Sequence, residues 1–179
     1  MLKPQDTLIA LKIWADYQQQ LVMPLREAAS LVGISVSEFS KGLQRLEAAK
    51  LVVTRDGRRF VERGALVEWL CYGVRYAYPA GQIGFGRGMP TAWNCPHVMS
   101  DILPPTPAMV WQQPKGTIEG VMITPIHDSA PLAASNNELM YQALALIDAV
   151  RLGKPRELAI ARELAIAREL LTKLIKGTL

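Results

Sequence analysis

Cysteine and histidine are scarce in this chain of 179 residues. It has two histidines, and Cys71 and Cys95 are its only cysteines. Two cysteines are too few for a disulfide framework, and neither a CxxC pair nor a regular histidine spacing accompanies them, which argues against a zinc site. No arrangement of serine, histidine and aspartate stands out as catalytic either. We therefore expect reduced thiols, no metal, no cofactor and no enzymatic activity.

Long apolar runs are also missing. No stretch stays apolar for the eighteen or so residues that a membrane helix needs, and the N-terminus, Met1–Asp6, lacks the pattern of a signal peptide. Half of the residues are nevertheless hydrophobic and 20% are charged, which is typical of globular proteins. We expect a folded, cytoplasmic protein without a membrane partner.

Positive and negative charges nearly balance, since the formal net charge is only +4. Its distribution is uneven, however. Between Lys41 and Arg63 there are seven basic and three acidic residues, so this short window alone accounts for the whole excess. A local basic surface is a better indication of a polyanionic partner than the total charge.

The first third of the chain has the pattern of a small helical unit. A helix is expected from Pro4 to Gln20, followed by a short strand at Leu21–Met23 and a helix from Pro24 through Leu31 that ends at Gly33. The next helix begins at Ser35, which forms a capping-box pattern with Glu38.

An extended hairpin follows this helix. The runs 51–55 and 58–61 have the alternation of strands, and Asp56-Gly57 between them is a strong signal for a type I′ turn. Three arginines gather near the tip of this predicted two-stranded wing: Arg55, Arg58 and Arg59.

This order of elements has a known counterpart. The run Leu25–Val61, LREAASLVGISVSEFSKGLQRLEAAKLVVTRDGRRFV, resembles the winged helix-turn-helix of bacterial transcriptional regulators of the MarR-like type. Turn and core positions of that motif are matched by Ala29, Gly33, Phe39, Leu43, Leu46 and Leu51. Gly42 departs from it, since the family often has a larger aliphatic residue there. The resemblance implies a helix that enters the major groove and a wing that meets phosphates or the minor groove.

The chemistry of the predicted recognition helix fits this role. Lysine and arginine can donate to guanine, glutamine can pair with adenine, and serine can reach bases or phosphates. Apolar residues of the helix share one face, so the polar ones are expected to point elsewhere. The candidate DNA-binding residues are Ser35, Ser37, Ser40, Lys41, Gln44, Arg45, Arg55, Arg58 and Arg59.

A helix is expected from about Ala65 to Tyr76. Residues 79–134 are rich in proline and glycine, and we expect irregular chain with one or two short strands, the glycine-rich 81–88 segment being a loop rather than a phosphate-binding motif. A small-molecule or protein effector could bind this region, although ordinary packing explains its tryptophans equally well.

The C-terminal part, 135–179, is expected to form a helical hairpin. Ser135 and Glu138 repeat the capping-box pattern, Gly153 ends the first helix, and the hexapeptide ELAIAR occurs twice in the second, at 157–162 and 163–168. One apolar stripe of the last helix is predicted to pack on the preceding helix: Ile160, Leu164, Ala167, Leu171 and Leu174. Leu158 and Ile166 lie opposite, which suggests a partner subunit as their cover. Alternatively, the repeat lengthens an exposed helix end and both are ordinary surface residues.

Together these patterns predict a mainly α fold with a small β-hairpin: a winged helix-turn-helix domain at 1–78, the proline- and glycine-rich region at 79–134, and the helical hairpin at 135–179. The predicted function is sequence-specific binding of double-stranded DNA by a transcriptional regulator that acts as a homodimer. The alternative is a winged-helix protein–protein interaction module, such as an antitoxin-like or adaptor protein.

Overall fold

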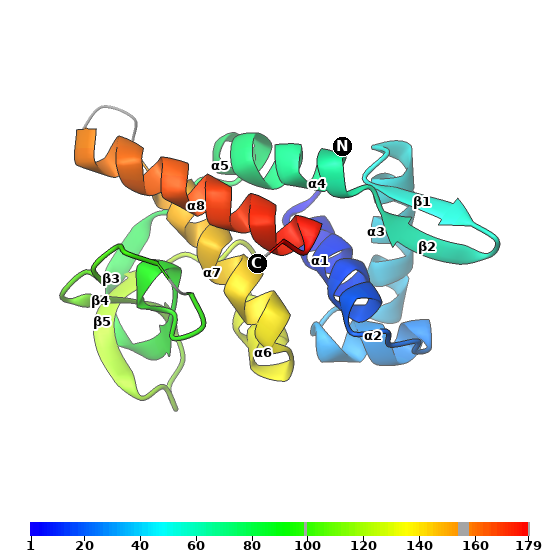
Figure 1. Ribbon diagram of the computed structural model, residues 1–179. Coiled ribbons are helices and arrows are strands. Elements are labelled where there is room, and N and C mark those ends of the chain that lie inside the picture. The colour runs from blue at the N-terminus through cyan, green and yellow to red at the C-terminus, as the bar shows by residue number, and fades with distance from the viewer. Residues whose placement is uncertain (99, 154–157, 179) are drawn as a thin grey trace.

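The chain is mostly helical and carries two small sheets (Figure 1). The computed structural model describes residues 1–98, 100–153 and 158–178, and only the backbone of 158–161. The helices are α1 (Pro4–Gln18), α2 (Leu25–Leu31), α3 (Val36–Ala48), α4 (Arg63–Glu68), η1 (Trp69–Gly73), α5 (Val74–Ala77), η2 (Ala92–Asn94), α6 (Ala130–Asn136), α7 (Glu138–Leu152) and α8 (Leu158–Lys176). The strands are β1 (Val52–Arg55), β2 (Arg58–Val61), β3 (Gln82–Pro90), β4 (Ala108–Gln112) and β5 (Ile118–Ile123).

The N-terminal helices and the hairpin follow the sequence pattern closely. Ser35 caps α3, because its Oγ accepts a hydrogen bond from the Glu38 amide at 3.2 Å. In the hairpin Arg55 pairs with Arg58, and the two turn residues, Asp56 and Gly57, have φ of +50° and +73°, as a type I′ turn requires. The capping signal and the Asp-Gly turn are therefore confirmed.

The short strand expected at Leu21–Met23 does not form. After α1 the chain turns at Gln20, which has a φ of +56°, and the Leu21 amide donates back to the Asp16 carbonyl. Among the described residues no backbone hydrogen bond joins 21–23 to β2. The hairpin is a sheet of two strands, as the predicted two-stranded wing requires.

A continuous helical segment forms where a helix was expected at about 65–76. It consists of α4, the π-helical turn η1 and α5, which follow one another without a break. Gly73 lies against the indole of Trp69, and a Cβ there would collide with the Trp69 ring. The close approach requires glycine, and the π turn lies where it occurs.

The middle region is more regular than its composition suggests. β3 pairs antiparallel with β4 and with β5, and β4 runs parallel to β5, so three strands close on one another. The prediction that 81–88 is a loop is wrong, because most of it belongs to β3. Gly88 shows why glycine occurs within this strand: a Cβ there would overlap the Trp111 carbonyl.

The capping residue predicted for the C-terminal helices is also wrong. Ser135 lies inside α6, where its Oγ donates to the Pro131 carbonyl, and it caps no helix. Asn137 caps α7 instead, since its Oδ1 accepts a hydrogen bond from the Met140 amide at 3.2 Å. Gly153 ends α7 as expected, and α8 then returns over α7 (Figure 1).

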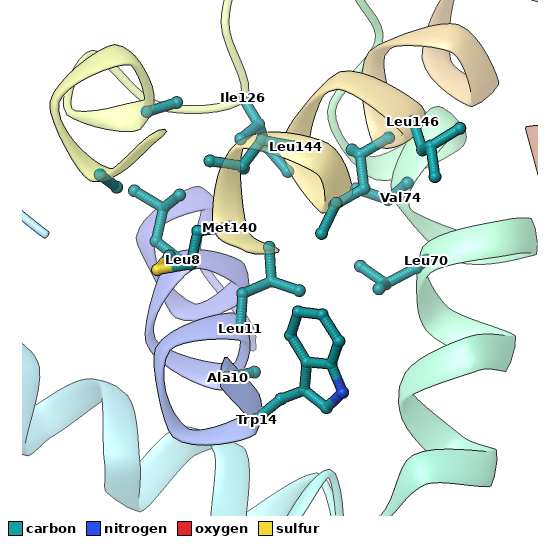
Figure 2. Close-up of a cluster of buried hydrophobic side chains, with 14 of the residues drawn as sticks. Leu8, Ala10, Leu11, Trp14, Leu70, Val74, Ile126, Met140, Leu144 and Leu146 are labelled. Atoms are coloured by element: carbon teal, nitrogen blue, oxygen red, sulfur yellow. The ribbon is translucent and has the colours of Figure 1, made fainter. Parts of the chain in front are cut away.

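One hydrophobic core runs through the whole chain. Figure 2 shows Leu8 of α1 beside Met140 of α7, and Trp14 of α1 toward Leu70 of η1. The buried residues form a single cluster that crosses the predicted boundaries at residues 78 and 134. The Trp14 Nε1 donates to the Ile175 carbonyl of α8, 161 residues away. The position of α1, and of whatever packs on α1, thus depends on the C-terminal helices.

A buried polar cluster attaches the three-stranded sheet to α7. The Asp148 carboxylate accepts hydrogen bonds from Thr91, from the Trp111 indole at 2.6 Å and from Arg151 at 2.6 Å. Arg151 also donates to the carbonyls of Tyr78 and Thr124. Every partner is satisfied, which is the condition for an ion pair to be tolerated inside a core.

The apolar stripe of α8 is buried against other parts of the same chain. Leu164, Ala167, Leu171 and Leu174 are buried, and Ile166 on another side of the helix packs against the same core, where α8 also contacts α4 and η1. The side chains of Leu158 and Ile160 lie outside the described residues. For Ile166, part of the cover comes from the chain itself.

In the part of the chain that the structure describes, no helix combines the length and the apolar character needed to cross a bilayer.

Candidate nucleic-acid interface

The outward face of α3 carries polar side chains. Ser37, Ser40, Lys41 and Gln44 are all exposed and follow one another at intervals of three, one and three residues, which places them on one side of the helix. The buried residues of α3, among them Phe39, face the opposite side. The structure therefore brings four of the predicted site residues together on one solvent-facing surface.

Ser35 belongs to the edge of this surface. It is exposed, but its hydroxyl oxygen already accepts the Glu38 amide in the cap of α3. The hydroxyl keeps its proton free to donate to an external acceptor. Lys41 is the principal cation of the face, with a side chain 61% exposed and the Glu38 carboxylate 3.6 Å away.

Arg45 does not join this face, and the prediction that it points outward is wrong. Its guanidinium donates from Nε and Nη2 to the two carboxylate oxygens of Asp6 in α1, both at 2.7 Å, and Asp6 is 1% exposed. The hydrogen bonds from Arg45 to Asp6 raise the pKa of the guanidinium further above its ordinary value. Arg45 thus joins α3 to α1 through Asp6.

Gly42 lies at the same contact. A Cβ at this position would collide with Ile9 Cδ1 and approach Asp6 Oδ1 to 2.9 Å. The glycine therefore lets α3 approach α1 closely enough for the Asp6–Arg45 pair to form. This gives a physical reason for the residue that departs from the MarR-like pattern. Spacing alone could not identify Asp6 as the partner, because the contact joins residues 39 positions apart.

The hairpin supplies three further cations, which differ in whether a carboxylate already pairs with them. Arg55 is 2.8 Å from the Glu62 carboxylate and Arg59 is 3.1 Å from Glu47. Hydrogen bonds from Thr54 and Arg59 lower the pKa of Glu47, which keeps that partner ionised. Arg58 is exposed next to the turn, and among the described residues no carboxylate pairs with it.

The turn between α2 and α3 is held by hydrogen bonds from residues 129–136, which come much later in the chain. Gly33 has a φ of +67°, its carbonyl accepts the Ser129 hydroxyl at 2.9 Å, and the Asn136 amide donates to the Leu31 carbonyl. A Cβ on Gly33 would also press on Leu132. Local sequence signals missed Ser129 and the α6 residues Leu132 and Asn136, because nothing in the sequence around 129–136 indicates contact with the turn.

Other reactive side chains do not assemble into a second site in the described part of the chain. No group of three or more histidine, cysteine or acidic residues there could hold a metal ion. Cys71 and Cys95 are buried, and burial raises the pKa of both thiols. Both behave as small core residues, not as reactive thiolates.

The surface thus combines a polar helix face, held on a rigid support, with an arginine-bearing hairpin. Comparisons of the chain with protein-family models, with curated proteins and with solved structures found no match.

Proposed function

We propose that the N-terminal part of the chain is a winged helix-turn-helix that binds double-stranded DNA in a sequence-specific manner. The observation that carries this proposal is the uncovered face of α3, with Ser37, Ser40, Lys41 and Gln44 directed to solvent. In Figure 1 the β1–β2 hairpin projects from the same end of the molecule as α3, away from the body. The major groove admits one helix of this kind, and a projecting hairpin can reach the neighbouring backbone.

Each side chain then has its own role. Lys41 and Gln44 read base edges, lysine preferring guanine and glutamine adenine, and the serines contact bases or phosphates beside them. Arg58 neutralises a phosphate. Arg55 and Arg59 exchange their carboxylate partners for phosphates, so they contribute less per residue because the existing ion pairs are lost. Arg45 supports the helix from behind through Asp6.

A transcriptional regulator that acts as a homodimer is the form of this function that we propose, because two-fold proteins gain affinity by contacting two half-sites. The buried stripe of α8 is not available for the dimer contact, since Leu171 and Ile175 are fully covered within the chain. Truncating α8 would expose the core, so oligomeric state is to be measured on the full chain by light scattering. A monomer at all concentrations that bind DNA would remove the homodimer from the proposal.

The test is a titration of fluorescently labelled duplex DNA, taken from around the protein's own gene, at several salt concentrations. Affinity is expected to fall steeply as salt rises, because phosphate contacts release counterions. Arg58→Ala is expected to weaken binding to every duplex and to reduce the salt slope by about one. Arg87→Ala is the matched control, since Arg87 is exposed on β3 outside the proposed interface.

Undetectable duplex binding at low ionic strength would reject the proposal. The protein–protein interaction module would then be the better account of the same surfaces.

A further inference from the structure

The outer edge of β2 carries unpaired backbone groups. In an antiparallel pair, hydrogen-bonded residue pairs alternate with pairs whose N–H and C=O groups point away from each other. The Glu62 amide donates to the Leu51 carbonyl, so the pairs Val53–Phe60 and Arg55–Arg58 are the hydrogen-bonded ones. The N–H and C=O groups of Arg59 and Val61 therefore point outward from the sheet.

The chain itself leaves this edge open. Leu21–Met23, the segment where a short strand was expected, makes no backbone hydrogen bond to β2 among the described residues. Side chains of this segment and of α1 are also unusually exposed for apolar residues: Tyr17 is 54%, Leu21 46% and Val22 86% exposed. An open strand edge beside exposed apolar side chains is the usual arrangement of a site that accepts another strand.

Two hollows lie along the edge and meet at one contact. The first, of about 650 Å³, is lined by residues that include Ile13, Met23, Leu25 and Phe60. The second, of about 830 Å³, continues along Phe60 and Val61 toward α4. Tyr17 and Phe60 line both, with their ring centroids 5.7 Å apart. The strand edge therefore faces open space along its length.

The charges around the two hollows are mainly positive. Lys12, Arg58 and Arg59 line the first with one carboxylate, Asp16, which Lys12 already contacts. The second adds the cations Arg55 and Arg63, and Arg63 lies over the Tyr17 ring. It also contains two carboxylates, Asp56 and Glu62, of which Glu62 pairs with Arg55. Around both hollows five cations therefore face three carboxylates. An occupant that carries carboxylates fits this surface, and one that carries cations does not.

We propose that this edge binds an extended acidic peptide segment of a partner protein, which adds a third strand to the β1–β2 hairpin. Its backbone bonds to the outward groups of Arg59 and Val61, its apolar side chains fill the hollows beside Tyr17 and Phe60, and its carboxylates face Arg58. Binding of such a segment is independent of the proposed DNA contact. One consequence does rest on the proposed function: the segment and DNA compete for Arg58, so the partner releases the protein from DNA.

The probe for this site is a fluorescently labelled, terminally blocked hexapeptide of three valines followed by three glutamates. Arg58 and Phe60 are two residues apart in β2 and share one face, so the added strand must present valine and glutamate on the same face to meet both. The peptide is expected to bind the full chain and to slow hydrogen exchange of the Arg59 and Val61 amides, whereas the outward groups of the hairpin are unprotected in its absence. The same peptide with lysine in place of glutamate is expected to bind at least about tenfold more weakly. A version N-methylated on the residues that face β2 is expected to lose about tenfold in affinity, since it cannot form the strand bonds.

Two variants locate the site. Arg58→Glu is expected to weaken the acidic peptide about tenfold, and Arg87→Glu, an exposed position on another sheet, is expected to leave its affinity unchanged. No binding of the acidic peptide, equal binding of the lysine peptide, or binding without protection of the two amides would each overturn the proposal. The exchange measurement uses the unmodified chain, so the outcome does not depend on how a variant folds. Because the peptide assay contains no DNA, its failure is separate from failure of DNA binding.

Discussion

Replacing Arg45 with methionine tests whether this arginine supports α3 or reads DNA. The substitution keeps an unbranched apolar side chain but removes the charge that faces Asp6. Asp6 is 1% exposed, and it retains only the hydrogen bond from the Lys3 amide at 2.8 Å. Removing one partner of a buried pair typically lowers the free energy of unfolding by 3–5 kcal/mol, and the remaining bond places the expectation near the lower value, about 3 kcal/mol.

The measurement is urea unfolding followed by tryptophan fluorescence, with thermal unfolding beside it. In a chain of this length a loss of about 3 kcal/mol lowers Tm by roughly 6–12 °C. Lys41→Met is the matched control: its charge is 61% exposed, so the expected change stays below about 0.5 kcal/mol. Combining Arg45→Met with Asp6→Leu is expected to recover part of the loss, because no buried charge is left unpaired.

A small effect would refute this reasoning. If Arg45→Met changed stability no more than Lys41→Met does, the pair would contribute nothing to the fold, and Arg45 would be available for DNA after all.

Three further outcomes follow from the packing. Gly42→Ala is expected to destabilise the protein by about 1–3 kcal/mol, despite the better helix propensity of alanine, because the added Cβ collides with Ile9. The double variant Gly42→Ala with Ile9→Ala is expected to recover part of that loss. An unchanged unfolding midpoint for Gly42→Ala would refute the close contact. Asp148→Ala is expected to lower the free energy of unfolding by about 3–5 kcal/mol because the buried Arg151 loses its carboxylate; a loss below about 1 kcal/mol would show the cluster to be dispensable. Cys71 and Cys95 are expected to resist iodoacetamide at pH 8 in the native protein and to react in urea, since burial raises both pKa values, and rapid native alkylation of either would contradict this.

Features fixed by neighbouring residues were predictable from the sequence. The Ser35 cap and the Asp56-Gly57 turn depend on residues no more than three positions apart, and both form as expected. The polar face of α3 followed from helical spacing in the same way. Each of these signals is read within one element, which is where propensity and capping act.

Features fixed by distant residues were not predictable. Helical spacing predicted that Arg45 points to solvent, but its guanidinium pairs with Asp6 of α1. Asn137 rather than Ser135 caps α7, because Ser135 lies within α6. The glycines of β3 suggested a loop, yet Gly88 permits close contact with the backbone of Trp111 in β4. Tertiary contacts decide these cases, and no local pattern encodes them.

Sequence discrimination by Gln44 tests the central proposal most directly. A duplex is selected from a random pool with the full chain, and its affinity is compared with that of random duplex for the unmodified protein and for Gln44→Ala. The unmodified protein is expected to prefer the selected duplex at least about 1,000-fold, and Gln44→Ala to reduce that preference by about 5- to 150-fold with little change on random DNA. Equal affinity of the unmodified protein for both duplexes would contradict the account.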